Sequence, residues 1–474
     1  MKKDTFDIIV VGAGSGGLNI ASFMNRVGLK VLLIDKSDAS IGGDCLNFGC
    51  VPSKALIHVA RTVNESKKAS AFGVGTTSSV DWKKVRAYIQ EKQEIIREHE
   101  NAEWFRAKGM TVVLGSASFV SKNQVAVDGV VYTGKKIVLA TGSRPRTLTG
   151  QGIEKVARVL NNENIFTMDS LPERIMFLGA GPIGIEIAQA LTHLGSKVTV
   201  VDPASQILGK EDSEMAGVVQ RQLEKDGVTL YLGYTLKEFT GRGEAMIESK
   251  EHGEKKVAFD AVFVGIGRVL NTEGLALEKA GIKVNEKGKI IVDPYLRTTN
   301  KNVLTCGDIA GNFLFTHAAE MHASVILKNF FSPFKKKFSG DSMSWTTYTT
   351  PEVATFGLGE AELTKRGVAH IVLASDFSED DRAITDEYQY GKSKLFITKK
   401  GNILGGTMVA SNAGELISEL VLAQKSGLGV DALFNKTYAY PSATRINKRI
   451  VSGFFVAKLT MSARSALRFL YRFI

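Results

Sequence analysis

Cysteine is scarce in this chain: only 3 of its 474 residues are cysteine. So few thiols exclude a disulfide-stabilised secreted scaffold and indicate a reducing compartment. No uncharged apolar run reaches the ~18 residues that a membrane-spanning helix needs, and the first residues resemble neither a signal peptide nor a transit segment. We therefore expect a cytoplasmic protein without a spanning helix, long enough for about three domains.

Acidic residues are absent from residues 432–474, which carry eight basic residues and so supply eight of the +11 net charges. The rest of the chain is close to neutral, which argues against a nucleic-acid partner. Histidine is sparse as well. His317 and His322 are five positions apart, which does not place them on one helical face, so we expect no metal site.

Two of the three cysteines lie in residues 42–54 (GGDCLNFGCVPSK). Four residues separate Cys45 from Cys50, a spacing that allows a small disulfide ring, and the neighbouring glycines give the backbone freedom to close it. Pro52 suits the first turn of a helix. A helix that begins near Cys50 would favour its thiolate, and Lys54 adds a positive charge on the same face. The pattern predicts a redox-cycling dithiol. The alternative is a structural disulfide or two unrelated core cysteines.

Two segments share one nucleotide-binding pattern: an apolar strand, a GxGxxG turn, a helical stretch and a second strand that ends in aspartate. The first copy has Gly12, Gly14, Gly17 and Asp35, and the second has Gly179, Gly181, Gly184 and Asp202. In both copies the acid follows the first glycine by 23 positions. Such a turn binds a pyrophosphate and the acid binds a ribose hydroxyl. Two copies predict two dinucleotides. The alternative is glycine turns in ordinary α/β units that bind nothing.

Together these motifs resemble the flavin-dependent pyridine nucleotide–disulfide oxidoreductases, such as dihydrolipoyl dehydrogenase, glutathione reductase and mercuric reductase. The resemblance implies an α/β fold with two Rossmann-like domains, for FAD and NAD, and a C-terminal α+β dimerisation domain. It also implies a homodimer whose active site is shared across the interface. The expected boundaries are 1–148 with 274–340 for FAD, 149–273 for NAD, 341–453 for dimerisation and 454–474 for a basic tail.

Further motifs resemble the family's cofactor sites, among them residues 136–145 (KIVLATGSRP) and 303–311 (VLTCGDIAG). With the first glycine turn and its acid, the resemblance implies an FAD site that includes Gly43, Lys54, Ala117, Thr141, Gly142, Ser143, Asp308 and Ala318. It adds Glu186 and Gly267 to the second copy, which would bind NAD. Asp308 would bind the ribityl chain, and Cys306 is interpreted as a small core residue.

The resemblance also pairs Glu186 with Lys54 beside the flavin, where a protonated amine favours the reduced ring. Asp202 would repel a 2′-phosphate, and no arginine or lysine directly follows it to receive one. NADH is therefore favoured over NADPH.

One C-terminal position departs from the family. Its disulfide reductases carry a His-Pro there and a glutamate five residues later, whereas this chain has Tyr440-Pro441 and Arg445. A phenol with a pKa near ~10 is a poor base at neutral pH beside an imidazole at ~6.5, although Arg445 favours the phenolate. We expect a cis Tyr440–Pro441 bond near the flavin of the partner subunit. No cysteine follows Cys306, so the C-terminal cysteine pair of mercuric reductases is missing as well.

These observations favour an NADH-dependent flavoenzyme with Cys45, Cys50, Lys54, Glu186 and Tyr440 at its catalytic site. Electrons would pass through FAD to the Cys45–Cys50 disulfide and on to a small-molecule acceptor that needs no histidine base: a metal ion, a quinone or a small oxidant. The first alternative is a dihydrolipoyl-dehydrogenase-like or glutathione-reductase-like dithiol–disulfide enzyme that uses Tyr440 in place of the histidine. The second is a flavoprotein kept for binding, with little turnover.

The tail, residues 454–474, is expected to form one amphipathic helix. On it, Phe455, Leu459 and Leu470 would share one side, with the basic residues largely elsewhere. Apolar residues opposite purely basic charge suit a helix that lies in an anionic membrane surface, which would place the protein peripherally on the inner face of a membrane. The alternative is a helix docked on the dimer.

Overall fold

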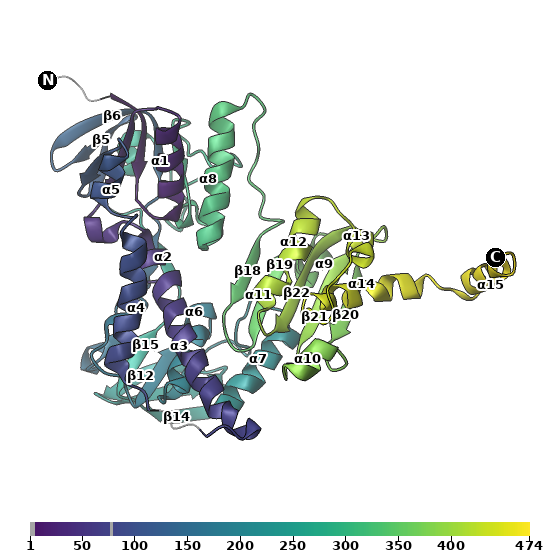
Figure 1. The fold of residues 1–474 in the computed structure, drawn as a ribbon. Helices are drawn as coiled ribbons and strands as arrows, with labels where there is room; N and C mark the ends of the chain where they lie inside the picture. Colours follow the sequence, from purple (N-terminus) through teal and green to yellow (C-terminus); the bar gives the residue numbers. More distant parts are fainter. Residues whose placement is uncertain (1–4, 76–78) are drawn as a thin grey trace. The chain divides into compact units, whose positions relative to one another are not determined.

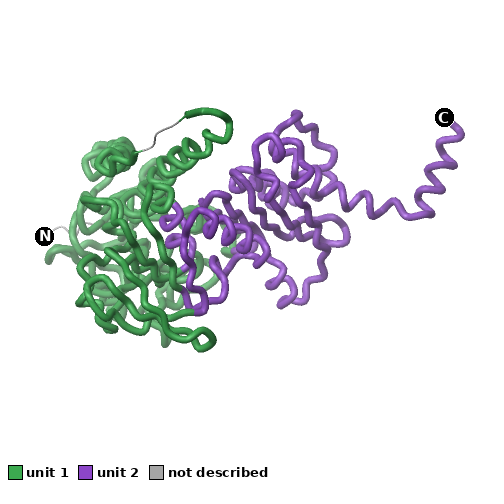
Figure 2. Tube along the Cα trace, turned by 90° about the horizontal axis from the view of Figure 1, so that it is seen from below, with its two compact units in different colours: residues 1–179, 190–201, 234–339 green, residues 180–189, 202–233, 340–474 purple. Residues whose placement is uncertain are grey.

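The computed structural model describes residues 5–75 and 79–474 of this α/β protein (Figure 1). The chain forms two compact units, each described by itself (Figure 2). The first unit contains residues 1–179, 190–201 and 234–339, and the second contains residues 180–189, 202–233 and 340–474. The boundaries expected for three domains remain a prediction.

The first unit contains a mixed sheet in the strand order β3-β2-β1-β6-β5-β4, with β17 also paired to β6. Its strands are β1 (Thr5–Val11), β2 (Val31–Asp35), β3 (Thr111–Leu114), β4 (Ala117–Ser121), β5 (Gln124–Val127), β6 (Val130–Leu139) and β17 (Val303–Thr305). β1 pairs in parallel with both β2 and β6. Nearly all side chains of β1 and β2 are buried, because both faces of a parallel sheet are covered.

Six helices lie wholly within the described residues of the first unit. They are α1 (Ser15–Arg26), α2 (Gly43–Asn47), α3 (Cys50–Lys68), α4 (Trp82–Arg97), α5 (Ala102–Ala107) and α8 (Thr316–Phe331). α1 packs against α8, and α3 packs against α4 (Figure 1). Asp81 caps the N-terminus of α4 by accepting hydrogen bonds from two backbone N–H groups, which fixes where this helix begins.

A second, parallel sheet in this unit follows the same design around the other glycine turn. Four strands of this sheet lie in the order β10 (Lys197–Asp202), β9 (Arg174–Leu178), β15 (Ala261–Val264) and β8 (Val159–Leu160). Helix α6 (Pro182–His193) follows β9, and its residues 182–189 belong to the second unit. Antiparallel strands β12 (Thr235–Gly241), β13 (Glu244–Ser249) and β14 (Gly253–Ala258) form a three-stranded sheet, and β7 (Ser143–Pro145) pairs with β16 (Arg268–Leu270).

The second unit is built on an antiparallel sheet in the order β18-β19-β22-β21-β20. These strands are β18 (Ser344–Thr347), β19 (Glu352–Gly357), β20 (Ile371–Asp376), β21 (Lys392–Ile397) and β22 (Ile403–Ala410). The unit also contains α7 (Ser213–Asp226), β11 (Thr229–Leu232), α9 (Glu360–Lys365), α10 (Asp381–Thr385), α11 (Ala413–Leu416), α12 (Ser418–Lys425), α13 (Val430–Asn435) and α14 (Arg445–Ala457). Buried side chains of the sheet, α12 and α14 share one hydrophobic core.

The expectation of one helix over residues 454–474 is wrong. Residues 454–457 are the last turn of α14, where the side chain of Phe454 is buried in the core of the second unit. A separate helix, α15 (Met461–Tyr471), starts after Thr460, whose hydroxyl accepts a hydrogen bond from the N–H of Ala463. This N-cap starts a new helix. No side chain of α15 is buried, and among the described helices none is long and apolar enough to cross a membrane.

Candidate active site

The segment that carries the cysteines is folded tightly onto the first glycine turn. Gly42 and Gly43 have φ angles of 87° and 62°, a backbone region that favours glycine. A Cβ at Gly43 would lie 2.7 Å from the Cα of Gly14, so only glycine allows this approach. The side chain of Asn47 donates hydrogen bonds to the carbonyls of Ile41 and Gly43 and braces the turn. Glycine at position 43 therefore joins the cysteine segment to the nucleotide turn.

Cys50 is the first residue of α3, as expected. Both cysteines of the pair are thiols in this structure, Cys45 half-buried and Cys50 exposed. The Sγ of Cys50 lies 3.2 Å from the Oγ1 of Thr316. A hydrogen bond from the Cys45 thiol is the largest cause that lowers the pKa of Cys50 to about 6, with help from Thr316 and the positive charge of Lys54. The same bond and burial raise the pKa of Cys45. At neutral pH, Cys50 is therefore mostly thiolate and Cys45 is a thiol.

The first glycine turn has the properties of a pyrophosphate cradle. A Cβ at Gly12 would lie 2.3 Å from the carbonyl oxygen of Ala140, and one at Gly17 would lie 1.9 Å from the oxygen of Gly12. Gly14 is the N-cap of α1, with no side-chain cap and no acidic residue in the first turn. Unsatisfied N–H groups at a helix N-terminus attract an anion. These residues fit the diphosphate of a bound FAD.

The second glycine turn repeats this local design. A Cβ at Gly179 would lie 2.5 Å from the carbonyl oxygen of Gly265, so the chain passes close behind the turn. Gly181 and Gly267 have open space where a side chain would stand. Gly184 lies in the first turn of α6. The geometry fits the second dinucleotide, and the individual binding roles remain predictions.

The aspartates that end the second strand of each nucleotide-binding segment, Asp35 and Asp202, have a structural role that the sequence did not reveal. Asp35 accepts the backbone N–H of Ala13 at 2.6 Å, and Asp202 accepts that of Ala180 at the same distance. Each carboxylate therefore ties the end of its strand to the glycine turn. Because a carboxylate has about four acceptor positions, both retain capacity for a ribose hydroxyl.

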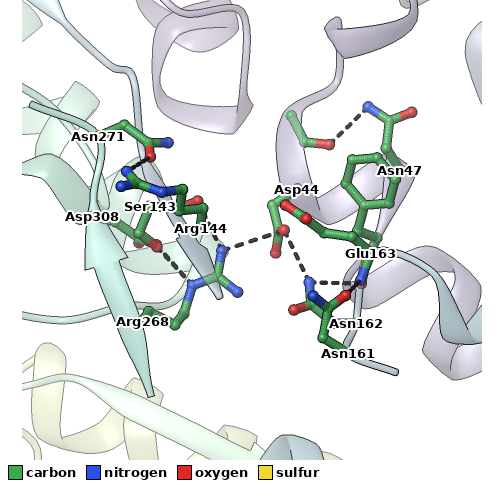
Figure 3. A network of polar contacts seen from close by, with 12 residues as sticks. Asp44, Asn47, Ser143, Arg144, Asn161, Asn162, Glu163, Arg268, Asn271 and Asp308 are labelled. Carbon is green, nitrogen blue, oxygen red and sulfur yellow. Dashed lines mark hydrogen bonds and ion pairs between the residues drawn. The ribbon is translucent and has the colours of Figure 1, made fainter. Parts of the chain in front are cut away.

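The flavin motif forms a polar network with the cysteine segment (Figure 3). The hydroxyl of Ser143 donates to the carboxylate of Asp308 at 2.5 Å and accepts from Nε of Arg268 at 2.6 Å. Nη2 of Arg268 bonds the Ser143 carbonyl at 2.9 Å and forms an ion pair with Asp44 at 3.3 Å. The sequence named Ser143 and Asp308 but missed Arg268, Asp44 and Thr316, which carry no spacing signal that links them.

The other residues assigned to the FAD site occupy different settings. Thr141 is fixed by two hydrogen bonds with Asn271, one in each direction at 2.8 Å. Gly142 has a φ of 67° and open space beside it. Ala117 begins β4 and is half-buried, whereas Ala318 lies in the first turn of α8 with a fully buried side chain. An alanine side chain has no polar or reactive group, so these two residues could contribute to FAD binding only by the space that their methyl groups occupy.

Comparison with known proteins agrees with this geometry. The family model for pyridine nucleotide-disulphide oxidoreductases matches residues 6–323, and the model for the dimerisation domain of this family matches residues 343–449. The chain belongs to this family. It is therefore an NAD-dependent flavin disulfide oxidoreductase of class I, with FAD and NAD(H) as its cofactors and a domain that pairs subunits into a homodimer.

The relatives include dihydrolipoyl dehydrogenases. That of Thermus scotoductus is 32% identical over 449 residues, with 92% of this chain and 95% of the relative covered. Dihydrolipoyl dehydrogenase 1 from Arabidopsis thaliana mitochondria is 31% identical, with 94% and 90% covered. A similar solved structure is the HOCl-induced flavoprotein disulfide reductase RclA from Escherichia coli, 25% identical, with a TM-score of 0.84 and 94% and 99% coverage. A Cu(II) complex of RclA has a TM-score of 0.83 and 25% identity, with 95% and 99% coverage.

Cys306, the third cysteine of this oxidoreductase, is a core residue as expected. Its side chain is buried, its Sγ lies 3.4 Å from the Ala319 carbonyl, and burial raises its pKa to about 12. Close by in sequence, the ring of His317 is stacked on Phe315. The described residues hold no group of three or more histidine, cysteine or acidic side chains arranged for a metal ion.

Lys54 and Glu186 lie in different compact units, so their pairing remains a prediction. Lys54 is half-buried on α3, one turn from Cys50. Glu186 is buried on α6, and its carboxylate accepts the N–H of Tyr348 at 2.8 Å. A buried carboxylate with a fixed orientation is suited to hold a partner in place.

The Tyr440–Pro441 bond is cis, as expected. Arg445 favours the phenolate, also as expected, but Asp381 outweighs it. The Tyr440 hydroxyl donates to a carboxylate oxygen of Asp381 at 3.1 Å, and this bond is the main cause that raises the pKa of Tyr440. The guanidinium of Arg445 lies over the ring, 5.0 Å from its centre, rather than beside the oxygen. Tyr440 is 65% exposed at a hollow of about 280 Å³. It is a hydrogen-bond donor at neutral pH.

Proposed function

We propose that this oxidoreductase passes electrons from NADH through FAD to the Cys45–Cys50 pair, and then to an acceptor that needs no histidine acid–base step. The observation that carries the proposal is the contrast between two groups. Cys50 is held as a thiolate, whereas Tyr440 is held as a protonated phenol by Asp381. Thiol redox chemistry is supported, while a neutral-pH base at position 440 is not.

The electrons and protons of the cysteine step balance without an external base. When bound, FAD supplies a two-electron relay between NADH and the cysteines. One hydride equivalent brings two electrons and one proton to the Cys45–Cys50 disulfide, whose S–S bond breaks to leave the Cys50 thiolate and the Cys45 thiol. Re-forming the S–S bond releases the same proton and delivers two electrons to the acceptor. By family resemblance, Cys50 faces the flavin and Cys45 meets the acceptor.

Three acceptor classes fit this chemistry: a metal ion, a quinone or a small oxidant. A thiophilic metal ion is the first to test, because the RclA relative is known as a Cu(II) complex and thiolates are preferred ligands of copper. Two Cu(II) ions would each take one electron and leave as Cu(I). The metal ion would be a substrate rather than a resident cofactor.

A second candidate function is a dithiol–disulfide reaction with Tyr440 as the proton carrier. It is favoured by the dihydrolipoyl dehydrogenase relatives, which cover nearly the whole chain. A third, binding with little turnover, is opposed by the lowered pKa of Cys50, because a protein that only binds has no need of a reactive thiolate.

The discriminating experiment is anaerobic reduction of the FAD-loaded protein with NADH, followed by a panel of acceptors. The panel contains Cu(II), a water-soluble quinone, hypochlorite, lipoamide and glutathione disulfide. We expect a thiolate-to-flavin charge-transfer band on two-electron reduction, and faster reoxidation by one of the first three than by either disulfide. Faster turnover of lipoamide would favour the second candidate, and reduction without any band would contradict the dithiol assignment.

The preference for NADH is assigned to Asp202. Its carboxylate is fixed by hydrogen bonds from the N–H groups of Ala180 and Ala204, at 2.6 and 2.7 Å, so it cannot easily turn away from an added phosphate. We expect kcat/KM to be at least ~10-fold higher for NADH, the effect of about 1.4 kcal/mol. Equal values for NADH and NADPH would contradict this assignment.

We also propose that α15 carries the protein to an anionic membrane surface. Its exposed side chains include Leu467, Phe469 and Leu470, and residues 458–474 hold four basic and no acidic side chains. Each basic residue near such a surface adds roughly 1 kcal/mol, and the apolar side chains add burial in the headgroup region. A peripheral position would bring a quinone acceptor within reach.

Sedimentation with phosphatidylserine-containing liposomes tests this role of the tail. Truncation after Leu459 removes α15 but keeps Phe454 in the core of the second unit. The matched control replaces Arg464, Arg468 and Arg472 with glutamine and keeps the apolar side chains. We expect the full chain to sediment at low salt and both variants to stay in solution. Equal recovery of all three in the supernatant would favour a tail that docks on the dimer.

A further inference from the structure

Arg268 connects three segments that are far apart in the sequence. It begins β16, opposite Pro145 of β7, and its guanidinium donates hydrogen bonds to Ser143. Only 11% of its side chain is exposed. Figure 3 shows its guanidinium between two carboxylates. One belongs to Asp44, 3.3 Å away and directly before Cys45, and the other to Asp308, 3.9 Å away.

The position of Asp44 is fixed from a second side. The side-chain amide of Asn162, itself buried, donates to the same Oδ1 of Asp44 at 3.2 Å and to the carbonyl of Phe48 at 3.3 Å. Asn162 therefore joins two points of the cysteine segment, and Arg268 joins that segment to the flavin motif. A planar guanidinium with several fixed donors suits such a junction better than a flexible ammonium group.

The charges of this cluster do not cancel. One guanidinium stands between two carboxylates, so the group has a net charge of −1 when all three are ionised. The guanidinium of this ion pair is nearly buried, whereas the side chain of Asp44 is 38% exposed. Removing Arg268 leaves this carboxylate without its ion-pair partner. The negative charge of Asp44 would then act on the adjacent cysteine pair without the compensating guanidinium.

We propose that Arg268 is a positioning residue for the redox cysteines, which holds Asp44 against the flavin motif and offsets its negative charge next to Cys45 and Cys50. This inference rests on the redox role proposed for the pair. It assigns a function to a residue 218 positions from Cys50 in sequence.

The electrostatics of Cys50 support the inference. The groups that act on its thiolate are Cys45 and Asp44 from α2, Thr316 from α8 and Lys54 from α3. Of these, Asp44 alone is negatively charged, and it raises the pKa of Cys50. The positive charge of Arg268, paired with Asp44, reduces the effect by which Asp44 raises the pKa of Cys50. Arg268 therefore acts on Cys50 through Asp44.

The test is a pH titration of the Cys50 thiolate in the reduced, FAD-loaded protein, followed by thiolate ultraviolet absorbance. Asp44→Asn should move the midpoint down and Arg268→Met should move it up, each by about one pH unit, the lower end of the effect of a nearby charge. In the double variant, the loss of Arg268 should have little further effect. The exposed ion pair of Arg174 with Asp260 supplies the control variant Arg174→Met, which should leave the midpoint unchanged.

Arg268→Lys separates charge from geometry and guards against a variant that does not fold. The pH midpoint of Cys50 in this variant should lie close to that of the wild type, because lysine keeps the positive charge. FAD retention should be weaker, because lysine lacks the forked set of donors of a guanidinium. Unchanged midpoints in both Asp44→Asn and Arg268→Met, or shifts of the same sign for these two variants, would overturn the inference. The titration needs no acceptor turnover, so failure of the proposed electron pathway would appear separately as a missing charge-transfer band.

Discussion

The start of α3 and the turn before α14 each present one ionisable side chain to chemistry, and their surroundings act in opposite directions. Cys50 lies at a helix N-terminus. Hydrogen bonds from Cys45 and Thr316, together with the positive charge of Lys54, lower the pKa of Cys50 to about 6. Tyr440 donates to Asp381, and this bond raises its pKa. One group is prepared to be an anion at neutral pH, and the other is kept neutral.

This difference separates two halves of a disulfide reductase reaction. The half that carries electrons retains its nucleotide turns and its cysteine pair. The family resemblance assigns the proton-moving half to a histidine and a glutamate. In this chain Tyr440 and Arg445 stand at those two positions, and the phenol of Tyr440 bonds to Asp381. This contrast is what supports the proposal of an acceptor that needs no histidine acid–base step.

The largest effect is expected from Cys50→Ser. A serine hydroxyl is not ionised at neutral pH, so the variant should lose the charge-transfer band and drop NADH-dependent reduction of the acceptor by on the order of 10³-fold. Absorbance spectra of the NADH-reduced protein and stopped-flow rates measure both. The matched control is Cys306→Ala, a buried thiol, which should keep the band. A band that survives Cys50→Ser would assign the thiolate to another residue.

Tyr440→His should restore the proton transfer that a disulfide reductase reaction needs. A histidine next to Asp381 would have a carboxylate to orient its ring, and a positioned base contributes typically ~10²-fold. We expect lipoamide or glutathione disulfide reduction to rise by up to this factor, with little change in the rate of reduction by NADH. Tyr440→Phe is the control and should leave disulfide turnover low. No gain in Tyr440→His would mean that proton transfer does not limit this activity.

The pH dependence of the reduced enzyme gives a smaller effect. Because the pKa of Cys50 is lowered to about 6, its thiolate should be present above that pH and disappear as the pH falls through it. The charge-transfer band should lose half of its intensity near pH 6. Below that pH, the ratio of thiolate to thiol should fall about tenfold for each further pH unit. A midpoint near ~8.5, the ordinary value for cysteine, would remove the electrostatic contrast with Tyr440.

Much of the electron-carrying half could be predicted from local sequence. Gly12 and Gly179 open turns with fixed spacing to an acid, and Cys50 follows a glycine and precedes a proline-containing helical turn. These signals lie within about 25 residues, where backbone geometry alone limits what the chain can do. The fold class was implied by the family resemblance that these repeats and the cysteine segment carry.

What the sequence did not reveal depends on contacts between distant segments. Arg268 and Asp44 are 224 positions apart, and Asp381 and Tyr440 are 59 apart, so no local spacing connects them. The break before α15 was missed for a different reason. An amphipathic pattern continued across Thr460, and its N-cap role decides the boundary only once the neighbouring backbone is known.

Asp381→Asn should produce the smallest effect and tests the Tyr440 side of the contrast directly. Removing the carboxylate that accepts the phenol's hydrogen bond should lower the pKa of Tyr440, because the nearby charge that remains is the guanidinium of Arg445. Both groups are exposed, so solvent screening keeps the change small. Difference titration of tyrosinate absorbance against Tyr440→Phe, in wild-type and Asp381→Asn backgrounds, isolates this one phenol. Because Asp381 is held to the phenol by a direct hydrogen bond, an unchanged titration in Asp381→Asn would show that another group keeps Tyr440 neutral, and the opposition between Cys50 and Tyr440 would then lack its structural cause.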